Sequence, residues 1–286
     1  MILVADSGST KTNWCLLRSD ADFRYFDTEG YNPYFVSSSY ITNSLAKHLP
    51  EDIIPEQITK IYFYGAGCFD DKVGIIEDAL QQVFAKAAID VGLDLLGSAR
   101  SVLGNKPGFA AILGTGTNSC LYDGTKITAN IDSLGYLLGD EGSGFYIGRK
   151  LLGDYIRQYM PAPVRKEFFE MYGLSREEIM ERVYSESLPN RFCAGFVQFI
   201  SESVSDTAYT HQLVKNAFID FFERLVIKYE NYDQFSFNCT GSVGYIFKDL
   251  LSETATMYRM KVGSIIKTPI EGLAAYHSSG THNKNI

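Results

Sequence analysis

Residues 2–17, ILVADSGSTKTNWCLL, contain two short apolar runs joined by a turn of small and hydroxyl-bearing residues. Short apolar runs bounded by Gly and Ser in this way predict a pair of antiparallel strands. Residues 110–122, AAILGTGTNSCLY, repeat the order of strand, Gly/Thr turn and strand. The repeat predicts a chain of two related halves.

Helices are expected between and after these strands. Apolar residues follow a helical spacing over residues 73–87, from a start at Asp70, and again over residues 94–103. Strands and helices that alternate in this order predict an α/β fold with mixed sheets. The other expected elements are strands over residues 23–26, 60–64, 126–129, 235–239 and 257–262, helices over residues 145–159, 208–229 and 269–276, and a helix opened by a capping box of Ser175 and Glu178.

The domain boundary is expected at residues 104–108, Gly-Asn-Lys-Pro-Gly, because such a cluster of helix breakers ends the preceding helix. The first domain is then formed by residues 1–108 together with residues 269–286, which return to it as a C-terminal helix. The second domain is formed by residues 109–268, and most of its helices are insertions.

The composition excludes several classes of protein. The chain has 286 residues, 26 Lys and Arg against 34 Asp and Glu, and a formal net charge of −8. An acidic chain of this kind is not expected to bind nucleic acid, which attracts basic surfaces. With 45% hydrophobic residues, it is typical of a folded globular protein.

The sequence also predicts a cytoplasmic protein. The apolar start reaches Asp6 too early for a signal peptide, so we expect the mature protein to begin at Met1. The longest uncharged stretch, residues 30–46, contains Asn32 and Pro33 and several serines, so no membrane span is expected. The five cysteines form no Cys-x-x-Cys pair and are expected to be reduced, buried thiols: Cys15, Cys68, Cys120, Cys193 and Cys239.

The two Gly/Thr turns are candidate phosphate sites. Glycines let backbone N–H groups approach an anion, and hydroxyls donate further hydrogen bonds. One such turn is ordinary hairpin chemistry, but two copies placed face to face would hold the phosphates of a nucleotide from both sides. Asp6 would repel those phosphates unless Mg²⁺ lay between them, often through water. The sequence therefore predicts an ATP and Mg²⁺ site.

Five segments, in order, resemble motifs of the N-acetylglucosamine kinase family, which is related to the BadF-BadG-BcrA-BcrD-type ATPases of the actin–hexokinase superfold. The resemblance covers nearly the whole chain, and it implies two actin-like ATPase (ribonuclease H-like) domains with mixed sheets flanking an interdomain nucleotide cleft. The segments are Asp6-x-Gly8-x-Thr10-x-Thr12, Asp94-Leu95-Leu96-Gly97-Ser98-Ala99, Leu113-Gly114-Thr115-Gly116-Thr117-Asn118-Ser119, Gly139-Asp140-Glu141-Gly142-Ser143-Gly144 and Thr240-Gly241-Ser242-Val243-Gly244.

The resemblance implies that Asp94 is the general base, which accepts the proton of the sugar hydroxyl as its oxygen attacks the γ-phosphoryl group. The alternative is an N-cap role for Asp94 in the helix that follows it, and the two roles can coexist. Asp6 would hold Mg²⁺. The side chain of Lys11 is expected to be solvated, because the family does not rely on a lysine there. The residues implied in nucleotide binding are Asp6, Gly8, Ser9, Thr10, Lys11, Thr12, Gly114, Thr115, Gly116, Gly241 and Ser242.

The resemblance places the sugar against Asp140, Asn32 and Asn118. Asp140 and Glu141 are also expected to begin a helix, where the dipole favours acidic residues without any ligand. Asn32 before Pro33 is equally typical of an ordinary turn. Related sugar kinases often carry an aromatic residue before the Gly-Asp-Glu-Gly-Ser motif, and Tyr136 is the candidate to replace it here.

The predicted function is an ATP-dependent kinase for a hydroxyl of an amino sugar, most directly N-acetylglucosamine, with the sugar as a small-molecule partner. One alternative is a BadF-like ATPase that activates a dehydratase, although it would need closely spaced cysteines for an iron–sulfur cluster. The other is a sugar or nucleotide sensor without transfer activity. The hydrophobic face of residues 208–229 is expected to bury either a homodimer interface or the core.

Overall fold

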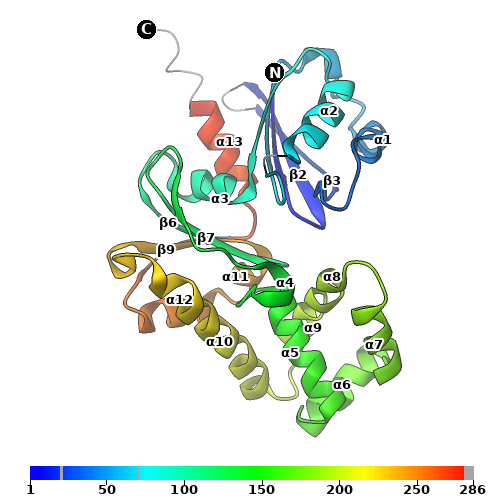
Figure 1. Ribbon diagram of the computed structural model, residues 1–286, viewed down its shortest axis with the longest axis vertical. Coiled ribbons are helices and arrows are strands. Elements are labelled where there is room, and N and C mark those ends of the chain that lie inside the picture. Colours follow the sequence, from blue (N-terminus) through cyan, green and yellow to red (C-terminus); the bar gives the residue numbers. More distant parts are fainter. Residues whose placement is uncertain (20–21, 70, 280–286) are drawn as a thin grey trace. The chain divides into compact units, whose positions relative to one another are not determined.

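The computed structural model describes residues 1–19, 22–69 and 71–279, and it divides into two compact units (Figure 1). Unit 1 comprises Met1–Pro107, Tyr122–Ile127 and Thr268–Ile286, and unit 2 comprises Gly108–Leu121 and Thr128–Lys267. Asp70, at the predicted start of a helix, and residues 280–286 of the predicted first domain lie outside the described residues.

Unit 1 is built on a five-stranded mixed sheet with the order β3-β2-β1-β4-β5. The antiparallel start is confirmed, because β1 pairs antiparallel with β2, and β2 with β3. On its other side β1 pairs parallel with β4, and β4 with β5. The strands are β1 (Ile2–Ser7), β2 (Lys11–Ser19), β3 (Asp22–Glu29), β4 (Lys60–Gly65) and β5 (Ala88–Leu93).

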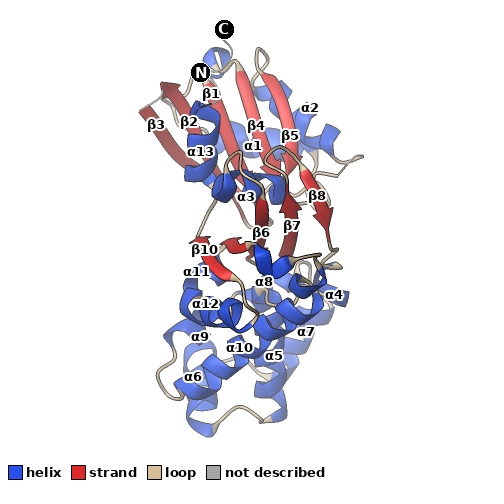
Figure 2. Cartoon of the chain, turned by 90° about the vertical axis from the view of Figure 1, so that its left-hand side faces the viewer, coloured by secondary structure: helices blue, strands red, loops and turns tan. Residues whose placement is uncertain are grey.

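Helices cover both faces of this sheet (Figure 2). Because side chains alternate along a strand, Leu3 and Ala5 of β1 join the core under α1 (Ser38–His48) and α2 (Val73–Val83). Val4, between them, joins a smaller core with residues of α13 (Ile270–Ser279), which packs against α3 (Asp94–Leu103). A single 3-10 turn, η1 (Pro55–Gln57), precedes β4.

Unit 2 is built on a second five-stranded sheet with the order β10-β9-β6-β7-β8, in which β6, β9 and β10 run parallel. The strand predicted over residues 257–262 is present but was placed too early, because α12 continues to Met257 and the strand begins only at Lys261. The strands are β6 (Gly108–Leu113), β7 (Thr117–Tyr122), β8 (Ile127–Asn130), β9 (Ser236–Thr240) and β10 (Lys261–Ile266).

Helices make up most of unit 2. The predicted helix over residues 208–229 is α10 (Thr207–Arg224), whose buried face includes Phe218 and Phe221 in the core of this unit. The capping box at Ser175 is present at the start of α7. The other helices are α4 (Gly135–Leu138), α5 (Gly144–Arg157), α6 (Ala162–Tyr172), α7 (Arg176–Tyr184), α8 (Pro189–Ala194), α9 (Val197–Glu202), η2 (Val226–Lys228), η3 (Tyr232–Gln234), α11 (Ser242–Ile246) and α12 (Lys248–Met257).

Two further expectations concern membranes and thiols. Among the residues that the structure describes, no helix is both long and apolar enough to span a membrane. All five cysteines are buried and unpaired, as expected. Trp14 is fully buried and donates its indole N–H to the hydroxyl of Thr28 (2.9 Å).

Candidate active site

The first Gly/Thr turn connects β1 to β2. The N–H of Gly8 donates to the carbonyl of Lys11 (3.0 Å), which closes the turn and leaves Ser9 and Thr10 at its tip. The Lys11 ammonium points away from this tip and pairs with Asp27 (3.3 Å) in an exposed ion pair. The turn can thus offer a ligand its tip residues rather than the lysine.

Thr12 has a different position from Thr10. Its side chain is fully buried; its hydroxyl donates to the carbonyl of Glu29 (2.8 Å) and is bonded to the hydroxyl of Ser7 (2.7 Å). Ser7 Oγ also accepts the N–H of Tyr31 (3.1 Å). Thr12 therefore braces the turn from inside, whereas the side chain of Thr10 is exposed.

Asn32 lies in a tight turn beside this loop. It is 9% exposed, and its Oδ1 accepts the N–H of Tyr34 (3.0 Å). Gly67 packs so closely that a Cβ there would lie 2.5 Å from Asn32 Oδ1. The Tyr34 ring is 57% exposed, and the ammonium of Lys72 lies 5.5 Å from its centre. The sequence analysis did not identify Tyr34 as a candidate site residue, although its position two residues after a turn asparagine could have indicated it.

Asp94 is the first residue of α3. The N-cap position belongs to Leu93, so the predicted N-cap role of Asp94 is wrong by one residue. Asp94 Oδ1 accepts the N–H of Leu95 (2.8 Å), which fixes the carboxylate at the start of the helix. Gly97 allows α3 to lie on the sheet, because a Cβ there would be 2.8 Å from Cβ of Tyr64.

A buried network fixes the other end of α3. Arg100 donates to the hydroxyl of Tyr64 (2.7 Å), which is also bonded to Nε2 of His277 on α13 (2.9 Å). Burial, assisted by the charge of Arg100, lowers the pKa of His277 to about 3, so this histidine is neutral near pH 7. The neutral ring and the Tyr64 hydroxyl are hydrogen-bonded to each other, and α3 is held between β4 and α13.

Asp6, the penultimate residue of β1, is the second carboxylate of the candidate site in unit 1. Burial, and then the charge of Asp94, raises the pKa of Asp6 to about 7. Burial raises the pKa of Asp94 itself to about 6. Asp6 Oδ2 accepts two long hydrogen bonds, from Asn13 Nδ2 (3.4 Å) and from Thr268 Oγ1 (3.5 Å). The pair can therefore hold a proton or attract a cation.

The donor set fits Mg²⁺ bound together with a phosphate. Among the described residues, no three His, Cys, Asp or Glu side chains form a complete metal site. Mg²⁺ does not need one, because it usually takes one or two carboxylates and fills its other positions with phosphate oxygens and water. Asp6 would hold the ion, which would supply positive charge beside the transferring phosphoryl group.

The second Gly/Thr turn, between β6 and β7, is tied to the start of α5. The N–H of Gly114 donates to the carbonyl of Gly116 (3.0 Å). The carbonyls of Gly114 and Thr115 accept the N–H groups of Gly144 (2.8 Å) and Phe145 (3.1 Å). These bonds fix the turn against the helix and leave the side chain of Thr115 half-buried.

Asp140 supports this turn. Its Oδ1 accepts the N–H of Thr117 (3.0 Å), and burial raises its pKa to about 6. Its other oxygen, Oδ2, would lie 3.1 Å from a Cβ on Gly116, so a side chain at this position would crowd the carboxylate. The prediction that Asp140 begins a helix is wrong, because its φ is 57° and α5 begins only at Gly144, capped by Ser143.

Two other predicted sugar-side residues are engaged within unit 2. Asn118 Oδ1 accepts hydrogen bonds from Nδ2 of Asn130 (2.9 Å) and from the N–H of Ser119 (2.9 Å). The ring of Tyr136 stands edge-on to that of Phe145, with 5.4 Å between their centres. Both side chains therefore have a structural partner.

The Thr240–Gly244 motif, at the end of β9, meets the second turn. Gly241 has a φ of 116°, and a Cβ there would collide with the carbonyl of Leu113. The contact brings Ser242 beside Gly114 and Thr115 in a cavity of about 340 Å³. The sequence analysis missed the opposite wall of this cavity, which carries no motif and is formed largely by Ala194, Gly195, Val197, Gln198 and Ser201.

Two mixed five-stranded sheets with flanking helices, each carrying a Gly/Thr turn, define an actin-like ATPase fold. A ROK family glucokinase from Streptomyces griseus, in complex with glucose and AMPPNP, shares it with a TM-score of 0.54 at 12% identity, over 96% of this chain and 97% of its own. A protein from Chromobacterium violaceum, provisionally named an N-acetylglucosamine kinase, shares it with a TM-score of 0.72 at 15% identity, over 96% and 98% of the two chains.

A protein from Porphyromonas gingivalis, also provisionally named an N-acetylglucosamine kinase, is 38% identical to this chain, with a TM-score of 0.93 over 98% of this chain and 100% of its own. The chain belongs to the N-acetylglucosamine kinase family and is a phosphotransferase of the kinase type. Comparison with protein-family models finds no match. Comparison with curated proteins finds none either.

Proposed function

We propose that the protein transfers the γ-phosphoryl group of ATP to a hydroxyl of an amino sugar, N-acetylglucosamine. The observation that carries the proposal is Asp94, a carboxylate fixed at the start of α3 with a pKa of about 6. A general base works best when its pKa lies near the operating pH. Membership of the N-acetylglucosamine kinase family, with 38% identity to the protein from P. gingivalis, supports this choice of substrate.

The proposed reaction gives a role to residues of each unit. Asp94 accepts the proton of the sugar hydroxyl, whose oxygen attacks the γ-phosphorus while the bond to the β-phosphate oxygen of ADP breaks. In unit 2, Gly114, Thr115 and Gly116 hold the phosphates, and Gly241 and Ser242 border the adenosine. The cavity of about 340 Å³ that Gly114, Thr115 and Ser242 help to line is within the size range of small-molecule pockets.

The tip of the first turn, Gly8, Ser9 and Thr10, holds the phosphates from unit 1 in this proposal. Thr12 acts indirectly, since its hydroxyl is engaged within the turn. Mg²⁺, held by Asp6, would neutralise charge on the phosphates.

For the sugar, we propose direct contacts with Asn32 and with Oδ2 of Asp140, whose Oδ1 is already bonded to Thr117. Asn118 stays in the proposed sugar site, but its Oδ1 is occupied by Asn130 and Ser119, which leaves its amide N–H groups as donors. The exposed ring of Tyr34 beside Asn32 offers an apolar face to the sugar.

The test is an ADP-release assay with N-acetylglucosamine, glucosamine, glucose and N-acetylmannosamine, with ³¹P NMR to identify the phosphorylated hydroxyl. We expect N-acetylglucosamine to give the highest kcat/KM. ADP release that does not depend on any sugar would reject the kinase proposal in favour of an ATPase. Sugar binding without ADP release would favour the sensor.

The dehydratase-activating ATPase is less well supported. Burial raises the pKa of the cysteine thiols, that of Cys68 and Cys120 to about 12. Thiols with such pKa values stay protonated near pH 7, whereas ligation to iron requires the thiolate. A purified protein with the absorption of an iron–sulfur cluster would reverse this ranking.

A further inference from the structure

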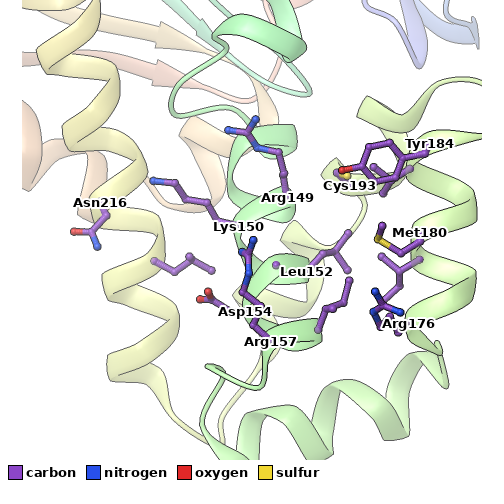
Figure 3. Close-up of a pocket in the computed structure, with 15 residues that line it drawn as sticks. Arg149, Lys150, Leu152, Asp154, Arg157, Arg176, Met180, Tyr184, Cys193 and Asn216 are labelled. Atoms are coloured by element: carbon purple, nitrogen blue, oxygen red, sulfur yellow. The ribbon is translucent and has the colours of Figure 1, made fainter.

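A second, larger cavity in unit 2 is unrelated to any of the sequence motifs. It has a volume of about 960 Å³ and lies beside α5, with α7 on one side and α10 on the other (Figure 3). Its buried floor includes Leu152, Ile179 and Leu213, which are between 1% and 8% exposed. The cavity is therefore large enough for a small organic molecule and apolar at its base.

Four cationic side chains line the same cavity, against one carboxylate, that of Asp154. Asp154 already accepts the hydroxyl of Tyr209 (2.9 Å). The four cations are Arg149, Lys150, Arg157 and Arg176.

Two of these cations have no carboxylate partner. Lys150 is bound to Asp220 (2.8 Å), and Arg176 lies 3.6 Å from its exposed neighbour Glu177. For Arg149 and Arg157, the described part of the chain provides no carboxylate oxygen within 4.0 Å. The Arg149 guanidinium instead lies over the rings of Phe145 and Tyr146, which orient it without neutralising its charge.

The geometry points to a binding site for an organic phosphate, that is, a phosphate-type anion carried on an apolar body. A guanidinium group matches the fork geometry of a phosphate, so Arg149 or Arg157, at different levels of α5, can each bind the anion, and the apolar floor takes the body of the ligand. Neither inorganic phosphate alone nor a neutral apolar molecule satisfies both parts of this lining.

Helix α8 borders both this cavity and the smaller cavity described above. Cys193 of α8 lines the larger one and Ala194, the next residue, lines the smaller one. Helix α5 lines the larger cavity with four charged residues and is bonded at Gly144 to Gly114 of the phosphate turn. Gly148 of α5 packs directly on the carbonyl of Cys193. A ligand that moves α5 against α8 thus changes the nucleotide pocket, a consequence that rests on the proposed function.

The binding test titrates the full chain with three probes, 1-naphthyl phosphate, 1-naphthol and inorganic phosphate, and measures their binding by calorimetry. We expect saturable binding of 1-naphthyl phosphate, weakened about tenfold or more in the double variant R149Q/R157Q. The matched control K166Q/R224Q removes the same charge from exposed positions outside the cavity and is expected to bind as wild type. A second variant, M180E, places a carboxylate on the half-exposed apolar rim and is expected to weaken binding too.

Equal binding to both double variants, no saturable binding to wild type, or equal affinity for 1-naphthol would overturn the proposal. The coupling is tested by titrating an ATP analogue with and without saturating 1-naphthyl phosphate. We expect the affinity for the analogue to change, and the same factor to appear when the order of addition is reversed. If the analogue does not bind at all, the proposed kinase function fails, whereas the probe titrations still decide the second site. If it binds with unchanged affinity, the coupling between the cavities is rejected.

Discussion

The carboxylate of Asp94 lies close enough to that of Asp6 for its charge to contribute to the raised pKa of Asp6, about 7. Asp6 is the penultimate residue of β1 and Asp94 begins α3, so two elements far apart in the sequence bring two acids together in unit 1. Groups arranged in this way are typical of functional sites, where burial and like charges shift pKa values toward neutrality. In the proposed reaction the pair divides two tasks, since Asp94 takes a proton and Asp6 takes a cation.

Replacement of Asp94 by Asn tests the first of these tasks. The amide keeps the shape and a carbonyl oxygen for the N–H of Leu95, but it cannot accept the hydroxyl proton. We expect kcat to fall about 10²- to 10⁴-fold, the usual contribution of a general base. Titration with an ATP analogue should give the wild-type affinity. A D94N enzyme with unchanged turnover would remove Asp94 from the mechanism.

The activity should have an acidic limb set by Asp94. Only the deprotonated carboxylate accepts a proton, so kcat/KM should fall about tenfold per pH unit below the Asp94 pKa of about 6. A pH–rate profile between pH 5 and pH 8, roughly one to two units either side of this value, measures the limb. A flat profile in this range would contradict the assignment.

Protonation of Asp94 should not unfold the protein over this range. The folded-state pKa, about 6, exceeds the reference value of 3.8. The folded state therefore binds this proton more tightly than the unfolded chain, and this group adds stability as the pH falls from 6 toward 3.8. Circular dichroism at each pH separates the two effects. A loss of helical signal in parallel with the activity would show that the acidic limb reports unfolding.

Thr115→Val tests the second Gly/Thr turn. The substitution keeps the shape of the side chain and removes a hydroxyl that borders the cavity of about 340 Å³. A hydrogen bond to a charged group contributes about 1.5–3 kcal/mol, so we expect affinity for ATP to fall at least tenfold. Thr128→Val, which removes a hydroxyl bonded to the carbonyl of Leu121, is the control. A normal ATP titration of T115V would count against this turn as a phosphate site.

The turns and the strands around them could be predicted because glycine and hydroxyl-bearing residues mark them directly. Helix α1 was missed, since its sequence begins with serines and its buried face consists mainly of Ile41 and Leu45, which pack against α2. The start of β10 was placed too early because Met257 is apolar, although Arg259, with a φ of 64°, marks the turn after α12. Tertiary packing therefore decided that α1 forms, and a backbone turn decided where β10 begins.

The candidate site was predictable by motif but not by the direction of each side chain. Nothing in the sequence distinguishes Thr10 from Thr12, yet pairing of Thr12 with Ser7 in the β1–β2 register buries one hydroxyl and leaves the other at the tip. Gly195 and Val197 were missed for another reason. They line the cavity of about 340 Å³ with small or apolar surfaces, and such residues carry no chemical signature in a single sequence.

A pair of glycine substitutions separates ligand binding from folding. Gly241→Ala adds a Cβ at a φ of 116° and against the carbonyl of Leu113, so we expect it to destabilise the fold by about 1–3 kcal/mol or more. Gly114→Ala meets no atom within 4 Å and should leave the melting temperature near that of wild type. Because the added methyl group of G114A lies at a turn that borders the cavity, it should still weaken ATP binding. Thermal unfolding and ATP titration of both variants check this, and a G114A protein with normal stability and full ATP affinity would mean that the nucleotide does not lie against Gly114.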